Sequence, residues 1–460
     1  MKIEQIKKAK NIALLWFWKE GKSNLNFLLK IWVEKGRITI LDKKKIEDID
    51  NNINHKHWDD YLNNLDKYDL IIKSPWISPY KRELVKYYNK IITQTSIFFD
   101  NKGEHKVIWI TATKWKSTTV SLLKELLTNA WLKIKLVWNI WTPVLDEIDI
   151  INNKEEYDFL IYELSSYMLE NLEPRCEIWL LGNIYKCHLD WHNNDYETYI
   201  RAKKNILLNS KHKLIGSDFP NLWEQIDDVQ YFWTSWNYTF DWNKLFINNT
   251  VYFEWDIKLK WNHNKKNITW ALWILDIINR NYIKIDIKDA LKKTLPEFKW
   301  LSHRLEDVWT YKWITFIDDG ISTTPESTIE AINTFEWNID SILLWWWDYW
   351  FTRDSYKLLI DRIVSNNISN VVLFPDTWLD IFELKWKYNF WDQFNLNIKN
   401  ININFLYTNK MESAIKFVYK NSKPWKICLL SCAAPSYSLW SWYEEKWKDF
   451  IENIIKLKNN

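Results

Sequence analysis

Short apolar runs alternate with stretches of helical periodicity along the whole chain, and this order is typical of parallel α/β folds. We predict strands at residues 11–17, 37–41, 69–73, 107–110, 157–162, 178–181, 314–317, 341–344, 370–374 and 427–430. We predict one helix that ends near residue 31 and others at residues 120–127, 196–207, 328–335 and 356–364. Alternating polar and apolar positions at about residues 230–260 predict small additional strands.

The length of 460 residues suggests several domains, each with a core of its own. We predict an α/β fold with three domains. These are a Rossmann-like domain over residues 1–100, a central P-loop ATPase-type domain over residues 101–296, and a Rossmann-like C-terminal domain over residues 297–460. No low-complexity linker separates them, so the boundaries are approximate.

The strand at residues 107–110 leads into Thr111-Ala-Thr-Lys-Trp-Lys-Ser-Thr-Thr119 and then into a helical pattern. This is the context of a phosphate-binding P-loop, whose signature ends in Gly-Lys-Ser/Thr. The glycine allows a left-handed turn, so that backbone N–H groups surround the anion. Trp115 stands at that place, and an indole there would fill the phosphate cavity and resist a positive φ. A loop with a genuine tryptophan at position 115 is therefore not expected to bind phosphate.

Tryptophan also stands at other places that favour glycine. The chain has 35 tryptophans and only 6 glycines, whereas glycine normally supplies about 7% of a globular chain. Trp76 and Trp141 lie at turn positions, and Trp345-Trp-Trp347 follows a strand-like run. We hypothesise that the source reads a codon, most simply UGA, as glycine where the printed sequence has tryptophan. The alternative is a truly tryptophan-rich protein, and the sequence alone does not separate the two kinds of position.

With glycine restored, residues 16–21 read as the nucleotide-binding pattern Gly-x-Gly-x-x-Gly, between a strand and a helix. Asp42 follows the second strand about 20 residues further on, where an acidic group commonly meets a ribose hydroxyl. An ordinary tight turn with an exposed aspartate is the alternative.

Polar residues follow the strands of the predicted central domain. Glu163 ends one strand beside the P-loop, where a carboxylate is well placed to hold Mg²⁺. His188, Asp190 and His192 follow the next strand, and their spacing is equally compatible with a metal or phosphate role for His188 and with a structural one. Lys203 lies on the helix after them, where a solvent-facing lysine is the simple alternative.

Charge and hydropathy limit the partners. The formal net charge is only +3, so no strong field favours nucleic acid or an anionic membrane. The cysteines form no disulfide or zinc pattern, and we expect Cys428 and Cys432 in a core. The N-terminus lacks the layout of a signal peptide, and no apolar window is long enough for a membrane span. We expect a reduced, soluble, cytoplasmic monomer without nucleic-acid or membrane partners.

Several segments carry a resemblance to a known family. They are Thr111 to Thr119, Trp138-Asn-Ile-Trp-Thr-Pro143, Glu163-Leu-Ser-Ser-Tyr-Met-Leu-Glu170, His188-Leu-Asp190, Trp261-Asn-His-Asn-Lys-Lys-Asn267, Trp300-Leu-Ser-His-Arg-Leu-Glu306 and Leu430-Ser-Cys-Ala-Ala-Pro-Ser-Tyr437. They resemble the Mur ligases, the ATP-dependent amino-acid ligases of peptidoglycan synthesis. The motif order matches the MurD branch, which joins glutamate to UDP-N-acetylmuramoyl-L-alanine. Nearly every motif glycine of the family stands here as tryptophan.

The resemblance implies roles for particular residues. The implied ATP-binding residues are Thr113, Lys114, Trp115 (as glycine), Lys116, Ser117, Thr118, His263, Asn264, Asn267, Arg304 and Asp319. The implied catalytic residues are Lys116, Glu163, His188 and Lys203, and the implied Mg²⁺ ligands are Ser117, Glu163, His188 and Lys203, the last as a carbamate. The implied contacts to the UDP-sugar and to glutamate are Phe17, Trp18, Asp42, Ser74, Asn139, Ser436, Tyr437 and Tyr443.

The resemblance also implies the chemistry. The alanyl carboxylate would attack the γ-phosphate of ATP, and the glutamate amine would attack the resulting acyl phosphate. Lys116 and Mg²⁺ would neutralise charge on the transferring group. The product would enter cell-wall synthesis in the cytoplasm.

Two positions depart from the family. Ile321 stands where a lysine is usual and Tyr349 where lysine or arginine is usual, and neither can pair with a carboxylate as a cation. Arg353 is a possible substitute. D-glutamate is the first expectation, and a sister ligase that adds L-glutamate is the alternative. A folylpolyglutamate-type ligase and a dehydrogenase each fit part of the chain, and a genuine Trp115 would favour a non-catalytic nucleotide-sugar-binding protein.

Overall fold

The computed structural model describes residues 1–47, 49–137, 143–147, 157–170, 172, 176–184, 189, 191–204, 210–216, 229–231, 238–241, 244–247, 250–254, 262–298, 301–322, 324–345, 353–375, 389, 391–434, 439–440 and 443–459. The chain divides into two compact units, Met1–Phe298 and Lys299–Asn460. The first unit contains two parallel sheets, and the division of its residues into two domains at about residue 100 stays a prediction. Among the described residues, no helix is both long and apolar enough to cross a membrane.

The first sheet of this unit is built from residues of the N-terminal quarter. Its strand order is β3 (Asn54–His57), β2 (Ile38–Asp42), β1 (Ile12–Leu15), β4 (Leu70–Lys73) and β5 (Ile91–Ile92), all parallel. The central strands β1 and β4 are buried along their length, which explains their continuous apolar sequence. Its helices are α1 (Ile3–Lys8), α2 (Lys19–Lys30), α3 (Arg82–Val85) and α4 (Gln94–Asn101).

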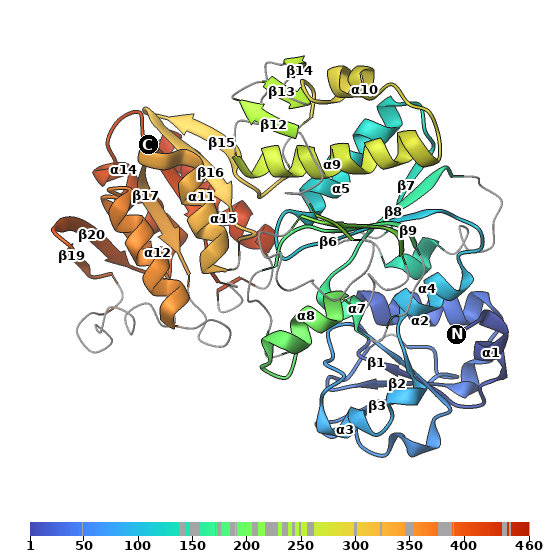
Figure 1. The fold of residues 1–460 in the computed structure, drawn as a ribbon. Helices are drawn as coiled ribbons and strands as arrows, with labels where there is room; N and C mark the ends of the chain where they lie inside the picture. The colour runs from blue at the N-terminus through green and yellow to red at the C-terminus, as the bar shows by residue number, and fades with distance from the viewer. Residues whose placement is uncertain are drawn as a thin grey trace. The chain divides into compact units, whose positions relative to one another are not determined.

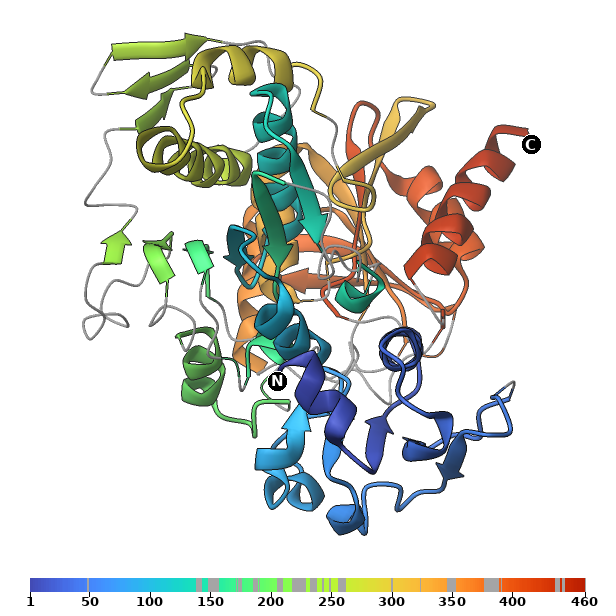
Figure 2. The ribbon, with the colours of Figure 1, turned by 90° about the vertical axis from the view of Figure 1, so that its right-hand side faces the viewer.

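The second sheet carries the predicted P-loop. Its parallel order is β11 (Val229–Tyr231), β10 (Ser210–Ile215), β9 (Cys176–Leu181), β6 (Val107–Thr111), β8 (Phe159–Glu163) and β7 (Ile134–Val137). Its helices are α5 (Lys116–Asn129), α7 (Ser166–Leu169), α8 (Tyr196–Lys204), α9 (Asn262–Asn281) and α10 (Ile287–Thr294). Helix α5 packs against α9 and α10 (Figure 1). A small antiparallel sheet, β12 (Tyr238–Asp241), β13 (Lys244–Ile247) and β14 (Thr250–Glu254), lies beside α10 (Figures 1 and 2).

One hydrophobic core joins these two parallel sheets. Leu14 and Phe98 from the N-terminal part belong to the same buried cluster as Val107, Trp109 and Tyr162 from the second sheet. The rings of Phe98 and Tyr162 meet edge to face with centroids 5.6 Å apart. Both sheets therefore belong to one packed unit.

The second unit is a single seven-stranded mixed sheet. Its order is β15 (Glu306–Tyr311), β16 (Ile314–Asp319), β21 (Ile427–Ser431), β17 (Ile339–Leu344), β18 (Asn370–Leu373), β20 (Ile401–Tyr407) and β19 (Gln393–Ile398). The edge strands β15 and β19 run antiparallel to their neighbours, and the inner strands are parallel. The helices are α11 (Pro325–Phe335), α12 (Arg353–Ser365), α14 (Met411–Asn421) and α15 (Tyr443–Asn459). Cys428 and Cys432 lie in its core, as the sequence predicted.

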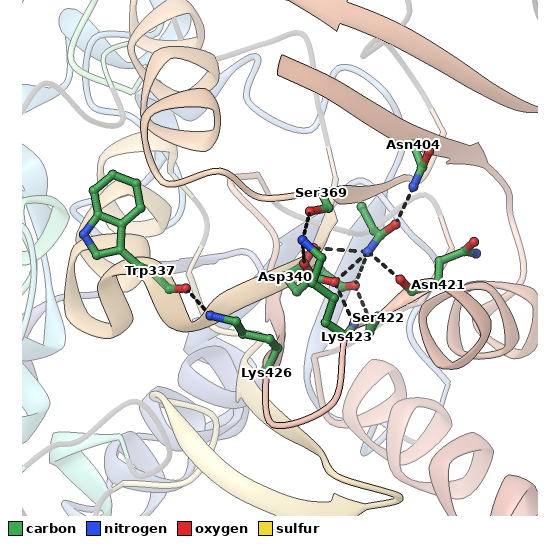
Figure 3. A network of polar contacts seen from close by, with 10 residues as sticks. Trp337, Asp340, Ser369, Asn404, Asn421, Ser422, Lys423 and Lys426 are labelled. Carbon is green, nitrogen blue, oxygen red and sulfur yellow. Dashed lines mark hydrogen bonds and ion pairs between the residues drawn. The ribbon is translucent and has the colours of Figure 1, made fainter. Parts of the chain in front are cut away.

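A buried polar network lies at the amino ends of β17 and β18 (Figure 3). The Asp340 carboxylate accepts hydrogen bonds from the Asn370 side chain at 3.0 Å and from the Lys423 backbone at 3.0 Å. The Lys423 ammonium lies 3.6 Å from the same carboxylate and donates to Ser369 Oγ at 3.3 Å. Asn404 donates to Asn370 Oδ1 at 2.9 Å. These contacts fix the strands at the end opposite to the carboxyl ends, where α/β proteins carry their sites.

The predicted strands are confirmed, with ends that shift by one or two residues. The predicted helices are confirmed as α2, α5, α8, α11 and α12, and the small strands near residues 230–260 are confirmed as β11 to β14. The sequence pattern missed β3, β5, β7, β10, β15, β19 and β20. Strand β5 is only two residues long, and each of the others mixes polar side chains with exposed or half-buried positions.

Among the described residues, seven tryptophans take the left-handed backbone conformation that favours glycine. Their φ angles lie between 65° and 80°, and they are Trp16, Trp32, Trp115, Trp131, Trp313, Trp391 and Trp425. Trp32 and Trp131 each follow the last turn of a helix, α2 and α5. At both places the two reversed backbone hydrogen bonds of a Schellman motif are present, from Trp32 N to Leu29 O and Val33 N to Leu28 O at the first.

Candidate active site

Asn183, which follows the neighbouring strand β9, binds the backbone of the loop after β6. The Thr113 backbone N–H donates to the Asn183 carbonyl at 2.8 Å, and the Lys114 N–H donates to Asn183 Oδ1 at 2.8 Å. Asn183 lies just after β9 and is buried. The amide of Asn183 therefore fixes where the predicted P-loop begins.

Trp115 is the N-terminal capping residue of α5, with φ 68° and ψ 7°. This is the left-handed conformation that a P-loop requires of its glycine. The backbone of Trp115 adopts it, although residues with a side chain rarely do. The Trp115 ring lies 6.4 Å from the ring of Trp270 on α9. The backbone has the geometry of a phosphate loop, while two indoles lie together at that loop.

Lys116, the next residue, curls back onto the loop. Its ammonium donates to the Ala112 carbonyl at 2.8 Å and to the Thr113 carbonyl at 3.4 Å. Both acceptors belong to the loop that would surround the phosphate groups of ATP. The lysine therefore lies at the loop, and its predicted contact with phosphate groups stays a prediction.

Ser117 in the first turn of α5 meets Glu163 at the end of β8. The Ser117 hydroxyl donates to Glu163 Oε1 at 3.0 Å. Glu163 is buried, and its second oxygen, Oε2, has no hydrogen-bond partner among the described residues. A hydroxyl and a buried carboxylate with an uncompensated oxygen are hard oxygen donors, the ligands that Mg²⁺ prefers. These residues fit a Mg²⁺ ion.

Lys203 comes to the same place from α8. It is 1% exposed, and its ammonium donates to Thr111 Oγ1 at 3.0 Å and to the Ala112 carbonyl at 3.4 Å. Thr111 in turn donates to the Leu164 carbonyl at 2.8 Å, just after β8. The alternative of a solvent-facing lysine is wrong for Lys203, because helix α8 turns this position inward beneath the loop.

Helix α9 contributes two buried amides. Thr119 on α5 donates to Asn267 Oδ1 at 3.1 Å, and Asn267 donates to Asn264 Oδ1 at 3.2 Å. The Asn264 amide nitrogen is buried and has no partner among the described residues. Thr118, one residue earlier on α5, is buried as well. The side chain of His263 lies outside the described residues.

Four predicted substrate residues, Phe17, Trp18, Asp42 and Ser74, lie at the ends of strands in the first sheet or in the loops that follow them. The Asp42 carboxylate accepts a 2.7 Å hydrogen bond from the Phe17 backbone, so it caps the turn after β1, while Trp18 opens α2 and is 40% exposed. The Ser74 hydroxyl donates to buried Glu20 at 2.9 Å. Burial raises the pKa of Glu20 to about 7, although the Ser74 hydrogen bond opposes this rise.

In the second unit, Asp319 ends β16 beside β21. Ser431 donates to its carboxylate at 2.8 Å, and burial raises the pKa of Asp319 to about 7. His303 Nδ1 lies 2.8 Å from Asp318, and the side chains of His303, Glu306 and Asp318 gather within 4.8 Å of one another. Arg304 interacts electrostatically with Asp319. The two predicted nucleotide contacts of this unit, Arg304 and Asp319, therefore lie near each other.

Several predicted residues lie outside the described residues. These are Asn139, His188, Tyr349, Ser436 and Tyr437, and the side chains of Arg353 and Tyr443. Ile321 is described and half-buried, directly after Asp319 and Gly320.

Sequence reasoning missed Asn183, Thr111 and Glu20 as parts of this arrangement. Asn183 and Thr111 stand at the ends of β9 and β6, so their position after buried runs could have singled them out. Glu20 lies within the glycine-rich turn, and no pattern indicated that it would be buried.

No family model matches the chain. The UDP-N-acetylmuramoylalanine–D-glutamate ligase of Clostridioides difficile (strain 630) is 28% identical over 98% of this chain and 99% of its own length. The ligase of the same name from Clostridium tetani (strain Massachusetts / E88) is 24% identical over 91% of this chain and 92% of its own.

Solved structures share the fold. The UDP-N-acetylmuramate-alanine ligase MurC of Thermotoga maritima matches 97% of this chain and 99% of its own, with a TM-score of 0.57 and 15% identity. The MurF ligase of Thermotoga maritima, solved in complex with ADP, matches 98% of this chain and 96% of its own, with a TM-score of 0.55 and 14% identity. A folylpolyglutamate synthase/dihydrofolate synthase of Yersinia pestis CO92 matches 74% of this chain and 89% of its own, with a TM-score of 0.52 and 12% identity. The chain is therefore similar to ligases of this name over nearly their whole length, and it shares the fold of the Mur ligase structures.

Proposed function

We propose that the chain is an ATP-dependent ligase that joins D-glutamate to UDP-N-acetylmuramoyl-L-alanine, in the cytoplasmic synthesis of peptidoglycan precursors. The observation that carries this proposal is the cluster of Lys116, Ser117, Glu163 and Lys203 around the loop after β6. The full-length similarity to relatives named for this reaction supports the choice of substrates.

The proposed reaction has two steps. A carboxylate oxygen of the alanyl group attacks the γ-phosphorus of ATP, and ADP leaves. The amine of glutamate then attacks the acyl carbon, the amine loses a proton, and inorganic phosphate leaves with the former carboxylate oxygen. Each step moves negative charge between oxygens, so positioning and electrostatic stabilisation supply most of the acceleration.

The chain's own residues have distinct tasks in this reaction. Lys116 leaves the carbonyls of its loop and places its ammonium on the β- and γ-phosphates. The backbone N–H groups at the start of α5 bind phosphate oxygens. Ser117 and Glu163 would hold Mg²⁺, with His188 as a further proposed ligand. When bound, the metal supplies positive charge that neutralises the phosphate oxygens.

We assign Lys203 to the same site as a carbamate. In the unmodified form its ammonium donates to Thr111 and Ala112. Addition of CO₂ to the neutral amine, with loss of one proton to water, would place an anion there, near the Ser117–Glu163 pair. Asn264 and Asn267 on α9, and Arg304 and Asp319 in the second unit, are proposed nucleotide contacts. Phe17, Trp18, Asp42, Ser74 and Asn139 are proposed for the UDP-sugar, and Ser436, Tyr437 and Tyr443 for glutamate.

The loop requires glycine at position 115 for this activity. The φ of 68° is the conformation of a glycine, and the Trp115 ring lies 6.4 Å from the ring of Trp270 at the same loop. We therefore include glycine at position 115 in the proposal. A protein with a genuine Trp115 would keep the fold and lose ATP-dependent ligation.

The test is a substrate-omission assay. The gene is expressed with a tRNA that inserts glycine at UGA, and ADP release is measured with ATP, Mg²⁺, UDP-N-acetylmuramoyl-L-alanine and D-glutamate. We expect ADP release only when all components are present, and a much slower reaction with L-glutamate. ADP release that ignores the UDP-sugar, or that prefers L-glutamate, would overturn the substrate assignment. Sedimentation of the same preparation tests the proposed monomer.

A further inference from the structure

A buried lysine shapes the loop that follows β4. Lys73 is the last residue of β4 and is 2% exposed, although lysine is almost never fully buried unless it is paired. Its ammonium donates to the Ser74 carbonyl at 3.0 Å and to the Ile77 carbonyl at 2.7 Å. Burial lowers the pKa of Lys73 to about 7, and the charges of Glu20 and Glu170 oppose this lowering. The lysine therefore closes residues 74–77 into a tight loop.

Trp191, in the segment between β9 and α8, contacts the same loop. Its indole N–H donates to the Pro75 carbonyl at 2.9 Å, and its own carbonyl accepts a 2.6 Å hydrogen bond from the Ser78 hydroxyl. The Lys73 ammonium lies 5.4 Å from the centroid of the Trp191 ring, within the range of a cation–π contact. Trp191 is buried, so these contacts are shielded from water.

The segment around Trp191 continues into α8, and the far end of α8 contacts the phosphate loop. His192 and Asn194 donate backbone hydrogen bonds to the Leu189 carbonyl, which closes a compact turn. Asp195 then caps α8 by accepting hydrogen bonds from Thr198 N at 2.9 Å and from Thr198 Oγ1. Lys203, at the far end of α8, reaches Thr111 beneath the loop. One short run of chain thus links the loop after β4 to the site after β6.

We propose that Lys73 and Trp191 form a latch that sets the position of loop 74–78 relative to the phosphate site, and that both are positioning residues for the UDP-sugar substrate. This inference rests on the proposed function, in which Ser74 contacts that substrate. Without the latch, the two parts of the substrate site lose their fixed spacing. Binding of the UDP-sugar then weakens, while binding of ATP at the loop after β6 does not.

The latch requires a genuine tryptophan at position 191. Trp191 is absent from the residues with positive φ, and its indole N–H has a defined acceptor. Glycine at this position would remove both the hydrogen bond and the ring beneath the lysine. The peptide that contains residue 191 should therefore carry the mass of tryptophan.

The test compares Trp191→Phe, Trp191→Ala and Lys73→Met with the parent enzyme. Phenylalanine keeps a ring and removes the donor, so we expect KM for the UDP-sugar to rise about fivefold, and the alanine and methionine variants to raise it by about tenfold or more. KM for ATP should stay within about twofold, as expected if ATP contacts are untouched. The exposed Lys86→Met variant is the matched control, and it should leave both KM values at the parent level.

The outcomes separate the latch from the proposed function. A parent enzyme that does not use the UDP-sugar would overturn the function itself. An active parent whose Trp191→Phe variant keeps its KM for the UDP-sugar would overturn the latch alone, as would equal losses for both substrates. Trp191→Phe is the conservative variant, so it keeps the test decisive if Lys73→Met fails to fold. A glycine mass at residue 191 would also overturn the latch.

Discussion

The hydroxyl of Ser117 donates to the carboxylate of Glu163 at 3.0 Å, and this contact joins the first turn of α5 to the end of β8. Replacement of Glu163 by glutamine keeps the shape and removes the charge that Mg²⁺ requires. We expect kcat/KM to fall by about a hundredfold to a thousandfold, the range seen when one key electrostatic group is lost. The measurement is steady-state ADP release at several Mg²⁺ concentrations, with the midpoint for Mg²⁺ shifted upward.

The control for this variant is Glu125→Gln, on the exposed face of the same helix. It should leave both the rate and the Mg²⁺ midpoint at the parent values. A Glu163→Gln enzyme with the parent's Mg²⁺ dependence would remove Glu163 from the metal site.

The backbone at Trp32 and Trp131 predicts glycine at both positions. Each residue has a positive φ and stands at the C′ position of a Schellman motif, where glycine is the usual residue. We extend the prediction to all seven left-handed tryptophans, including Trp115. Peptide mass spectrometry of the protein from its source should show glycine at these seven sites.

Two tryptophans serve as controls in the same spectrum. Trp191 and Trp440 each donate an indole hydrogen bond, to the Pro75 carbonyl and to Asp449, and should keep the mass of tryptophan. Tryptophan masses at the seven left-handed sites would refute recoding.

By contrast, the indole nitrogens of Trp109, Trp179, Trp270, Trp345 and Trp447 are buried without a hydrogen-bond partner among the described residues. At Gly182 and Gly216 an added Cβ would lie 2.6 Å and 2.3 Å from the Trp270 indole. These buried tryptophans are the next candidates for glycine.

The buried carboxyl group of Asp319 predicts a pH dependence of stability. Its pKa in the folded protein is raised to about 7, above the unfolded value of 3.8. Between these two values the folded state holds a proton that the unfolded state has released. The contribution of Asp319 to stability is therefore full below about pH 4 and is lost as the pH rises toward 7. In the Asp319→Asn variant, the free energy of unfolding, measured with urea, should fall less steeply than in the parent as the pH rises from about 4 to 7.

Asp361→Asn, an exposed position in the same unit, is the control and should keep the slope of the parent. An unchanged slope in Asp319→Asn would show that Asp319 is already ionised in the folded protein at low pH.

A substitution in the polar network around Asp340 should lower stability and leave the candidate site intact. Replacement of Asn370 by alanine removes the 3.0 Å hydrogen bond to the buried Asp340 carboxylate and the contact from Asn404. We expect a destabilisation of about 2 kcal/mol, because a buried charged acceptor loses a partner. Urea denaturation measures this change. The exposed Asn397→Ala variant should change stability by less than about 0.5 kcal/mol, and an equal loss in both variants would contradict a special role for the network.

Buried parallel strands were the part of the fold that the sequence predicted best. Strands β1, β4 and β6 are apolar along their length because both faces are covered, and such runs are readable without context. Strand β7 is half-exposed and contains Lys135, so its pattern resembles a loop. Edge strands such as β19 are set by pairing with a distant neighbour, which no local pattern contains.

The sequence predicted the positions of those site residues whose place follows from their spacing along one loop and helix. Lys116 and Ser117 begin α5, after the four residues that follow β6, so their place was readable from the loop signature. The inward direction of Lys203 was not, because it depends on how α8 packs against the end of β6. The partnership of Lys73 with Trp191 joins residues from two sheets, and it became visible only in the folded chain.

The most direct test of the central claim follows one oxygen atom. UDP-N-acetylmuramoyl-L-alanine labelled with ¹⁸O in the alanyl carboxylate is incubated with ATP, Mg²⁺, D-glutamate and the enzyme that carries glycine at UGA positions. An acyl-phosphate ligase must transfer one labelled oxygen to each inorganic phosphate released, and mass spectrometry of that phosphate should show it together with the glutamyl product. Phosphate without the label, or no product from the glycine-containing enzyme, would contradict the proposed ligation.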